Sequence, residues 1–204
     1  MKFGYSKTTS KFATHLPDLM LNSLITSQTR IKLLKKFFLN RSTKAHLRGL
    51  ETEFGESSNA IRLELNRFEA AGLLSSLRDG NKTVYQANPA HPLYSDIHKL
   101  ILKETGIDRV IEKVIHRIGT LLAVYLTGDF AHGKDSPVIE LILVGTDIDR
   151  EYLARKIVQA EGLVGRKVSY IVLGQGEAEE YLGKFKPSDL LPLWKTKKTE
   201  LVKE

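Results

Sequence analysis

The sequence contains no cysteine among its 204 residues. This absence excludes disulfide bonds, thiolate nucleophiles and zinc sites built from cysteine. The six histidines lack the spacing of a metal-binding motif, so neither a metal nor any other cofactor is predicted. No apolar run approaches the ~18 residues of a membrane span, and residues 1–18 lack the apolar stretch of a secretory signal. We therefore expect a cytoplasmic protein with no membrane partner.

The positive charge is confined to the first half of the chain. The formal net charge is +7 at pH 7. Residues 1–105 carry 16 Lys and Arg against 9 Asp and Glu, whereas residues 106–204 carry 15 of each kind. A basic excess favours a polyanionic partner, because Lys and Arg neutralise phosphates and release their counterions. The alternative is an ordinary solvated basic face.

Three helical segments and a β-hairpin are predicted in this basic half. Apolar residues at helical spacing predict helices over 27–40, 45–54 and 57–71. Strand-like runs follow at 73–77 and 83–87, joined by a turn at Arg78-Asp79-Gly80-Asn81. Three helices followed by a hairpin is the element order of a winged helix-turn-helix, a fold whose second motif helix lies in the DNA major groove.

The helix predicted over 57–71 carries a polar stripe opposite its apolar residues Ile61, Leu65 and Phe68. Arg side chains in such a stripe can read guanine and Asn side chains can read adenine, while the helix N-terminus suits a phosphate. The alternatives are a merely solvated face or a module that docks another protein. The residues predicted to contact double-stranded DNA are Ser57, Ser58, Asn59, Arg62, Asn66, Arg67, Arg78, Asn81 and Lys82.

Three segments resemble the ArsR/MarR-like winged helix-turn-helix regulators. Residues 27–40 resemble the first helix of those proteins, residues 56–74 their recognition helix and residues 80–88 their wing. The resemblance covers about residues 24–108. It implies a cytoplasmic, dimeric transcriptional regulator that binds operator DNA. Metal-sensing members of the family use cysteines, so metal sensing does not carry over to this chain.

Two further helices are predicted over 93–104 and 108–118, with Asp108 as the cap of the second and Leu93 and Leu100 among the inward residues of the first. Their apolar positions exceed what a linker needs, so we expect a homodimer interface here. The predicted fold class is α+β. The predicted layout is a flexible arm at 1–18, a winged helix-turn-helix domain at 19–90, a helical linker at 91–118, a small α/β domain at 119–185 and a tail at 186–204.

A glycine-bearing loop distinguishes the second half of the chain. Residues Gly128 to Asp135 read Gly-x-x-x-x-Gly-Lys-Asp, which places Asp135 where a phosphate-binding P-loop has Ser or Thr. A strand instead of a helix is predicted after this loop, so nucleotide hydrolysis is disfavoured. Asp147-Ile-Asp149 is explained by helix capping more simply than by metal binding. The predicted strands are 121–127, 138–144 and 167–173.

Residues 119–173 also resemble the minimal nucleotidyltransferase fold, in which a Gly-Ser loop precedes a strand with two carboxylates. Here Asp129 replaces the serine, Val138 replaces the first carboxylate, and the third falls near Ser169. Only Glu140 keeps its charge, whereas the chemistry needs several carboxylates around two metal ions. The resemblance therefore implies a small α/β domain without catalytic activity. The alternative is an active nucleotidyltransferase with an atypical metal site.

A ligand can still occupy this loop, because a fold does not fix function. We expect a small-molecule or nucleotide effector as one interpretation, and glycines that only close a tight turn as the other. The candidate ligand residues are Gly128, Asp129, His132, Gly133, Lys134 and Glu140. The function predicted from the sequence is a DNA-binding transcriptional regulator with an inactive nucleotidyltransferase-like sensor or interaction domain, and not an enzyme.

Overall fold

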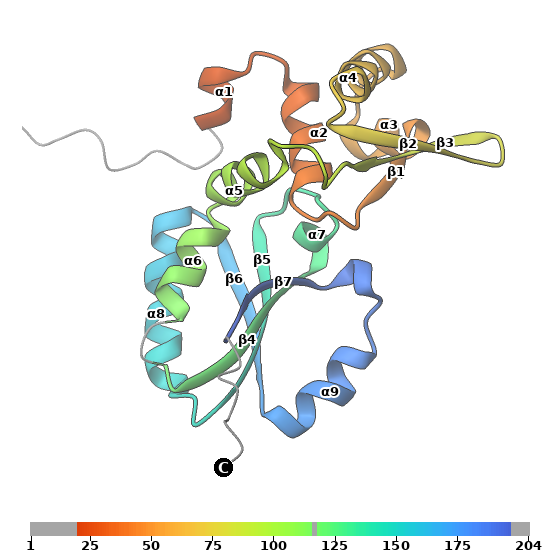
Figure 1. Ribbon diagram of the computed structural model, residues 1–204. Coiled ribbons are helices and arrows are strands. Elements are labelled where there is room, and N and C mark those ends of the chain that lie inside the picture. The colour runs from red at the N-terminus through yellow and green to blue at the C-terminus, as the bar shows by residue number, and fades with distance from the viewer. Residues whose placement is uncertain (1–19, 116–117, 197–204) are drawn as a thin grey trace, which may run out of the picture.

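The computed structural model describes residues 20–115 and 118–196 (Figure 1). The chain has the predicted α+β class, with helices and two small sheets. The arm predicted at 1–18 lies outside the described residues. Within the described residues, no helix has the length and apolar character to cross a membrane.

The helices of the first half are α1 (Met20–Leu24), α2 (Gln28–Phe38), α3 (Leu47–Phe54) and α4 (Ser58–Ala70). The Ser27 hydroxyl caps α2 by accepting a hydrogen bond from the backbone N–H of Arg30. The Ser57 hydroxyl caps α4 in the same way. The helix predicted to begin at residue 45 begins at Leu47, because the residues before it form a strand.

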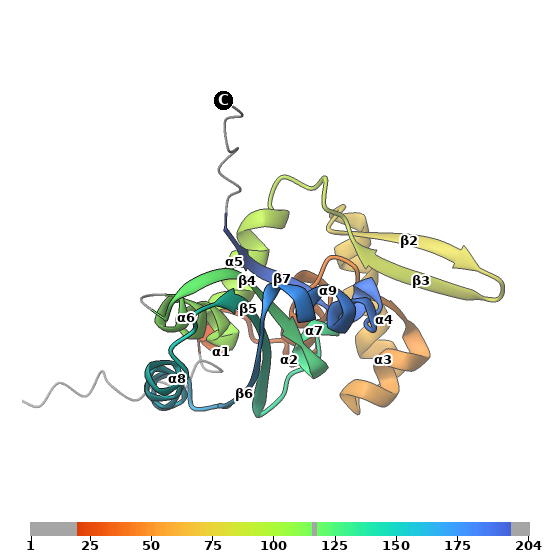
Figure 2. The ribbon, with the colours of Figure 1, turned by 90° about the horizontal axis from the view of Figure 1, so that it is seen from below.

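The first sheet is antiparallel with the order β1-β3-β2, built from β1 (Lys44–His46), β2 (Leu74–Asp79) and β3 (Lys82–Ala87). Asp79 pairs with Lys82, so the two turn residues are Gly80 and Asn81, within the segment predicted as the turn. Gly80 enables this tight turn, because it adopts a φ of +58° that side chains disfavour. Figures 1 and 2 both show β2 and β3 projecting away from the rest of the molecule.

Two helices, α5 (Tyr94–Thr105) and α6 (Ile107–Val114), connect the halves. The sequence prediction was wrong about two details here. Asp108 does not cap α6, which follows directly on Gly106 and has no side-chain cap. Leu93 and Leu100 do not point inward, since they are 54% and 38% exposed.

The second sheet has the order β6-β5-β4-β7. Strands β5 and β6 are parallel, because α8 (Arg150–Val164) crosses between them, and the other pairs are antiparallel. Helices α6 and α8 lie on one face and α9 (Gln175–Gly183) on the other (Figure 1). The strands are β4 (Thr120–Thr127), β5 (Val138–Thr146), β6 (Lys167–Leu173) and β7 (Leu191–Lys195). Strand β7 lies within the predicted tail, so part of that segment belongs to the sheet.

The core runs through both halves without a break. Buried apolar side chains from α2, α5, α7 (Gly128–Ala131), β5 and α8 belong to one contiguous cluster. Phe37 and Phe38 of α2 and Phe130 of α7 are its largest fully buried members, each at most 1% exposed. The second half therefore packs directly on the helix that supports α4.

Candidate functional site

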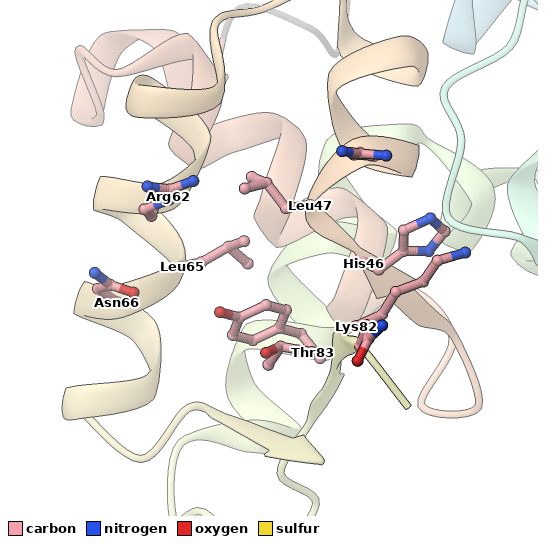
Figure 3. Close-up of a pocket in the computed structure, with 10 residues that line it drawn as sticks. His46, Leu47, Arg62, Leu65, Asn66, Lys82 and Thr83 are labelled. Carbon is pink, nitrogen blue, oxygen red and sulfur yellow. The ribbon is translucent and has the colours of Figure 1, made fainter. Parts of the chain in front are cut away.

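A groove of about 470 Å³ lies between α4, the start of α3 and the hairpin (Figure 3). Four of the residues predicted to contact DNA line it. Arg62 and Asn66 come from the exposed face of α4, one turn apart, and Asn81 and Lys82 come from the hairpin. The buried Leu65 lies at the base of the groove, beside Leu47 (Figure 3). The structure thus brings together side chains that are up to 20 residues apart in sequence.

The groove is positively charged. Arg48, Arg62 and Lys82 line it, and no Asp or Glu does so among the described residues. Three lining cations, with no lining carboxylate among the described residues, favour an anionic ligand such as a phosphate backbone.

Sequence reasoning missed four polar residues of the groove: His46, Arg48, Thr83 and Tyr85. Strand β1 brings His46 opposite Val84 of β3, and Arg48 follows at the start of α3. A three-residue strand leaves no periodic signal, so this pairing was not visible in the sequence. Only the basic character of Arg48 could have drawn attention to it.

Tyr85 of β3 lies within reach of two opposite charges of α4, those of Glu69 and Arg62. Burial raises the pKa of its hydroxyl, the charge of Glu69 adds to this, and the charge of Arg62 opposes it. A tyrosine hydroxyl is protonated at neutral pH even without this shift, so Tyr85 can donate a hydrogen bond to a ligand in the groove.

The other predicted contact residues lie outside the groove. The Arg67 guanidinium pairs with the Glu64 carboxylate at 3.0 Å, and Arg30 of α2 holds the same carboxylate at 2.8 Å. Burial raises the pKa of Glu64, but the hydrogen bond and charge of Arg30 outweigh it, and the pKa lies below its usual value. Arg67 therefore pairs within α4, with the carboxylate that Arg30 of α2 also holds.

The other four of these residues lie near the ends of α4 and β2. Ser57 uses its hydroxyl to cap α4, while Ser58 is the first helical residue. Asn59 is exposed on α4, and Arg78 is exposed on β2, where it pairs with Thr83.

The glycine loop of the second half is a junction with the first half. It begins with the helical turn α7 and not as the open loop predicted. A Cβ on Gly133 would collide with the backbone carbonyl oxygen of Lys36 in α2. The Asn40 side-chain amide donates to the carbonyl oxygens of Ala131 at 2.7 Å and Ser188 at 3.1 Å.

Asp135 fastens the same junction by two ion pairs. Its carboxylate lies 2.8 Å from the Lys35 ammonium of α2 and 2.9 Å from the Arg166 guanidinium. Burial raises the pKa of Asp135, but the hydrogen bond to Lys35 and the charges of Lys35 and Arg166 prevail, so the net pKa is lowered. Asp135 is therefore ionised at neutral pH, where its pair with Lys35 holds α2 to the second half and its pair with Arg166 stays within that half.

A second pocket, of about 370 Å³, opens on the α9 face of the second sheet. It is lined by three of the candidate ligand residues, namely Gly128, His132 and Glu140. The imidazole of His132 lies 2.8 Å from the Gly128 carbonyl oxygen and 3.1 Å from the Asp189 carboxylate. Asp189 comes from the segment predicted as a tail, and sequence reasoning missed it.

The remaining loop candidates do not line this pocket. Lys134 pairs with Asp129 at 3.5 Å, and Gly133 is buried against α2. Among the described residues, no group of three or more His, Asp or Glu side chains is arranged to hold a metal ion. The pocket is lined by a few polar side chains, among them His132, Glu140 and Asp189, and otherwise mainly by apolar and aromatic ones.

No protein family matches the sequence. The chain is similar to the histidinol-phosphate aminotransferase of Staphylococcus saprophyticus, with 24% identity over 129 residues. The match covers 62% of this chain but 34% of that protein. The chain thus spans about a third of the aminotransferase, and this similarity shows no family for it.

Proposed function

We propose that this protein is a transcriptional regulator that binds double-stranded DNA through a winged helix-turn-helix formed by α2, α3, α4 and the β2–β3 hairpin. The observation that carries the proposal is the groove between α4 and the hairpin, lined by three cations and by no carboxylate among the described residues. In a winged helix-turn-helix, these are the two elements that face DNA.

We assign some residues of the groove to contacts with DNA bases and others to contacts with the DNA phosphate backbone. Arg62 and Asn66 line the groove. In this proposal they read base edges in the major groove, since Arg and Asn side chains can form paired hydrogen bonds with guanine and adenine. Leu63 lies on the same helix and is 52% exposed, so it can contact a thymine methyl group. Arg48 and Lys82 flank these residues and suit phosphates.

The second half is proposed to bind an effector or another protein and not to catalyse nucleotide transfer. Val138 precedes Glu140 by two residues on β5, and Ser169 of β6 pairs with Glu140; these are the places where the resemblance to a nucleotidyltransferase would need carboxylates. Because two metal ions need several anionic ligands, we expect no nucleotide transfer to an acceptor.

The first test is binding to DNA across a salt series. We expect fluorescence anisotropy to give a steep fall in affinity with rising salt, using fragments selected by genomic pulldown. A double Arg48→Ala, Lys82→Ala variant should reduce the slope of log K against log salt by about 2, because each phosphate contact contributes about 0.9. The charge-matched control is Lys113→Ala with Arg150→Ala, both exposed and outside the groove. Salt-independent binding, or none to any genomic fragment, would reject the proposal.

The protein is also proposed to act as a homodimer, because two-fold symmetry doubles the contact with DNA half-sites. The apolar side of α6 is already buried. The interface candidates are therefore two exposed residues, Leu93, which directly precedes α5, and Leu100, which lies on α5. Light scattering should give twice the 23.0 kDa of one chain. Leu100→Asp should shift the mass toward the monomer, whereas Val158→Asp, at an exposed position of α8, should not. A monomeric wild-type protein at micromolar concentration would contradict this.

A further inference from the structure

The pocket on the α9 face of the second sheet has an acidic rim. Its lining residues include the carboxylates of Glu140 and Asp189, but no Lys or Arg among the described residues. The Ser188 hydroxyl and His132 lower the pKa of Asp189, so this group is ionised at neutral pH. Two carboxylates without a lining cation repel phosphates, which argues against the nucleotide considered as an effector.

The Glu140 carboxylate lies close to the backbone of Gly128. A Cβ on Gly128 would collide with the Glu140 carboxylate, so the two groups lie in close contact. Gly128 also has a φ of +66°, which suits glycine. Glu140 is exposed, and no hydrogen bond or ion pair engages its carboxylate within the described part of the chain. Its charge is therefore available to a ligand.

The rest of the pocket is apolar and aromatic. Glu140, Ile142 and Ile171 share one face of the sheet, because side chains alternate along strands and Ile142 pairs with Ile171. Across from them, Tyr181 and Phe185 of the α9 segment form a tilted ring pair with centroids 5.7 Å apart. Lys184 lies 5.9 Å from the Tyr181 ring centroid, but it pairs with Glu180 at 3.1 Å.

We propose that this pocket binds a small organic cation, whose apolar body lies between Ile142, Ile171 and the Tyr181–Phe185 pair and whose amine meets Glu140 and Asp189. Aromatic faces attract cations, and a charge-assisted hydrogen bond to a carboxylate fixes the amine. The volume of about 370 Å³ is near the lower end of the range for small-molecule sites, about 300–1,000 Å³. A single-ring amine is of suitable size.

The pocket also adjoins the junction with α2. Its residues His132 and Asp189 directly follow Ala131 and Ser188, whose carbonyl oxygens accept the two hydrogen bonds of Asn40. A bound amine therefore acts one residue away from the contacts that position α2. An effect on DNA binding rests on the proposed function, whereas the cation site itself does not.

The test compares three probes that share a phenol ring and differ in charge: tyramine, 4-ethylphenol and 3-(4-hydroxyphenyl)propionate. Isothermal titration calorimetry on the full chain should show tyramine binding at least about tenfold tighter than 4-ethylphenol, and the anion weakest. ATP without metal should bind more weakly than tyramine. Equal binding of the three probes, tighter binding of the anion or of ATP, or no tyramine binding at millimolar concentration would overturn the proposal.

Substitutions of the two pocket carboxylates test whether tyramine binds in this pocket. Glu140→Gln and Asp189→Asn should each weaken tyramine about five- to tenfold and leave 4-ethylphenol unchanged, since only the charged contact is lost. Glu179→Gln removes the same charge from an exposed position of α9 outside the pocket and should have no effect. Unchanged tyramine affinity in both Glu140→Gln and Asp189→Asn would reject the site. Anisotropy with DNA is a separate measurement, so failure to bind DNA leaves the calorimetric result intact.

Discussion

Gly133→Ala is expected to lower the free energy of unfolding by about 2–5 kcal/mol. Gly133 has a φ of +69°, which is strained for alanine, and the added Cβ would collide with the Lys36 carbonyl oxygen. Neither group can retreat easily, because the loop is fixed by Asn40 and Asp135 and the carbonyl belongs to α2. Urea unfolding followed by circular dichroism measures the change.

The matched control is Gly162→Ala in α8. This glycine has no positive φ and nothing within 4 Å of an added Cβ, so alanine should stabilise the helix by about 0.5–1 kcal/mol. If both variants unfold at the same urea concentration as the wild type, α2 and the glycine loop are not packed as described.

Arg62→Lys is expected to abolish discrimination at one base pair while leaving most of the salt dependence intact. Lysine keeps the charge but lacks the planar fork that forms two hydrogen bonds with guanine. The loss should amount to about 1–3 kcal/mol, or roughly 5- to 150-fold in the preference for one sequence over its mismatch. Competition gel shifts with single-base variants of the bound fragment measure it.

Arg67→Lys on the same helix provides the comparison. Arg67 is paired with Glu64 outside the groove, so its replacement should change sequence preference little. Equal losses in the two variants would mean that α4 does not read bases through its groove-facing side. Full discrimination in Arg62→Lys would show that Arg62 contacts only phosphate.

Local signals predicted most of the helices and strands. Ser27, Gly55 and Asp149 mark element ends by capping or by a left-handed backbone, and these effects depend on a few neighbouring residues. Strand β1 was missed because three residues are too few to show alternation. Strand β7 was missed because Pro192 interrupts its pattern, which is tolerated at the sheet edge, where the pairing with β4 shifts register.

The candidate sites were predictable only in part, for the same reason. Arg62 and Asn66 follow from helical periodicity, which local sequence reveals. His46 joins them through the pairing of β1 with β3, and Asp189 joins His132 across 57 residues. These neighbours depend on long-range packing, which a single sequence does not display.

Because the core is continuous between α2 and the second sheet, neither half of this chain is suited to exchange with a domain of another protein. Phe37 and Phe38 are buried in a cluster that includes Phe130 and Leu153 from the other half. A hybrid that joined the first half to a foreign partner would expose these rings to water and leave Lys35 without Asp135. Any recombination that preserves the fold must therefore carry α2 together with the glycine loop, although about 90 residues separate them in the sequence.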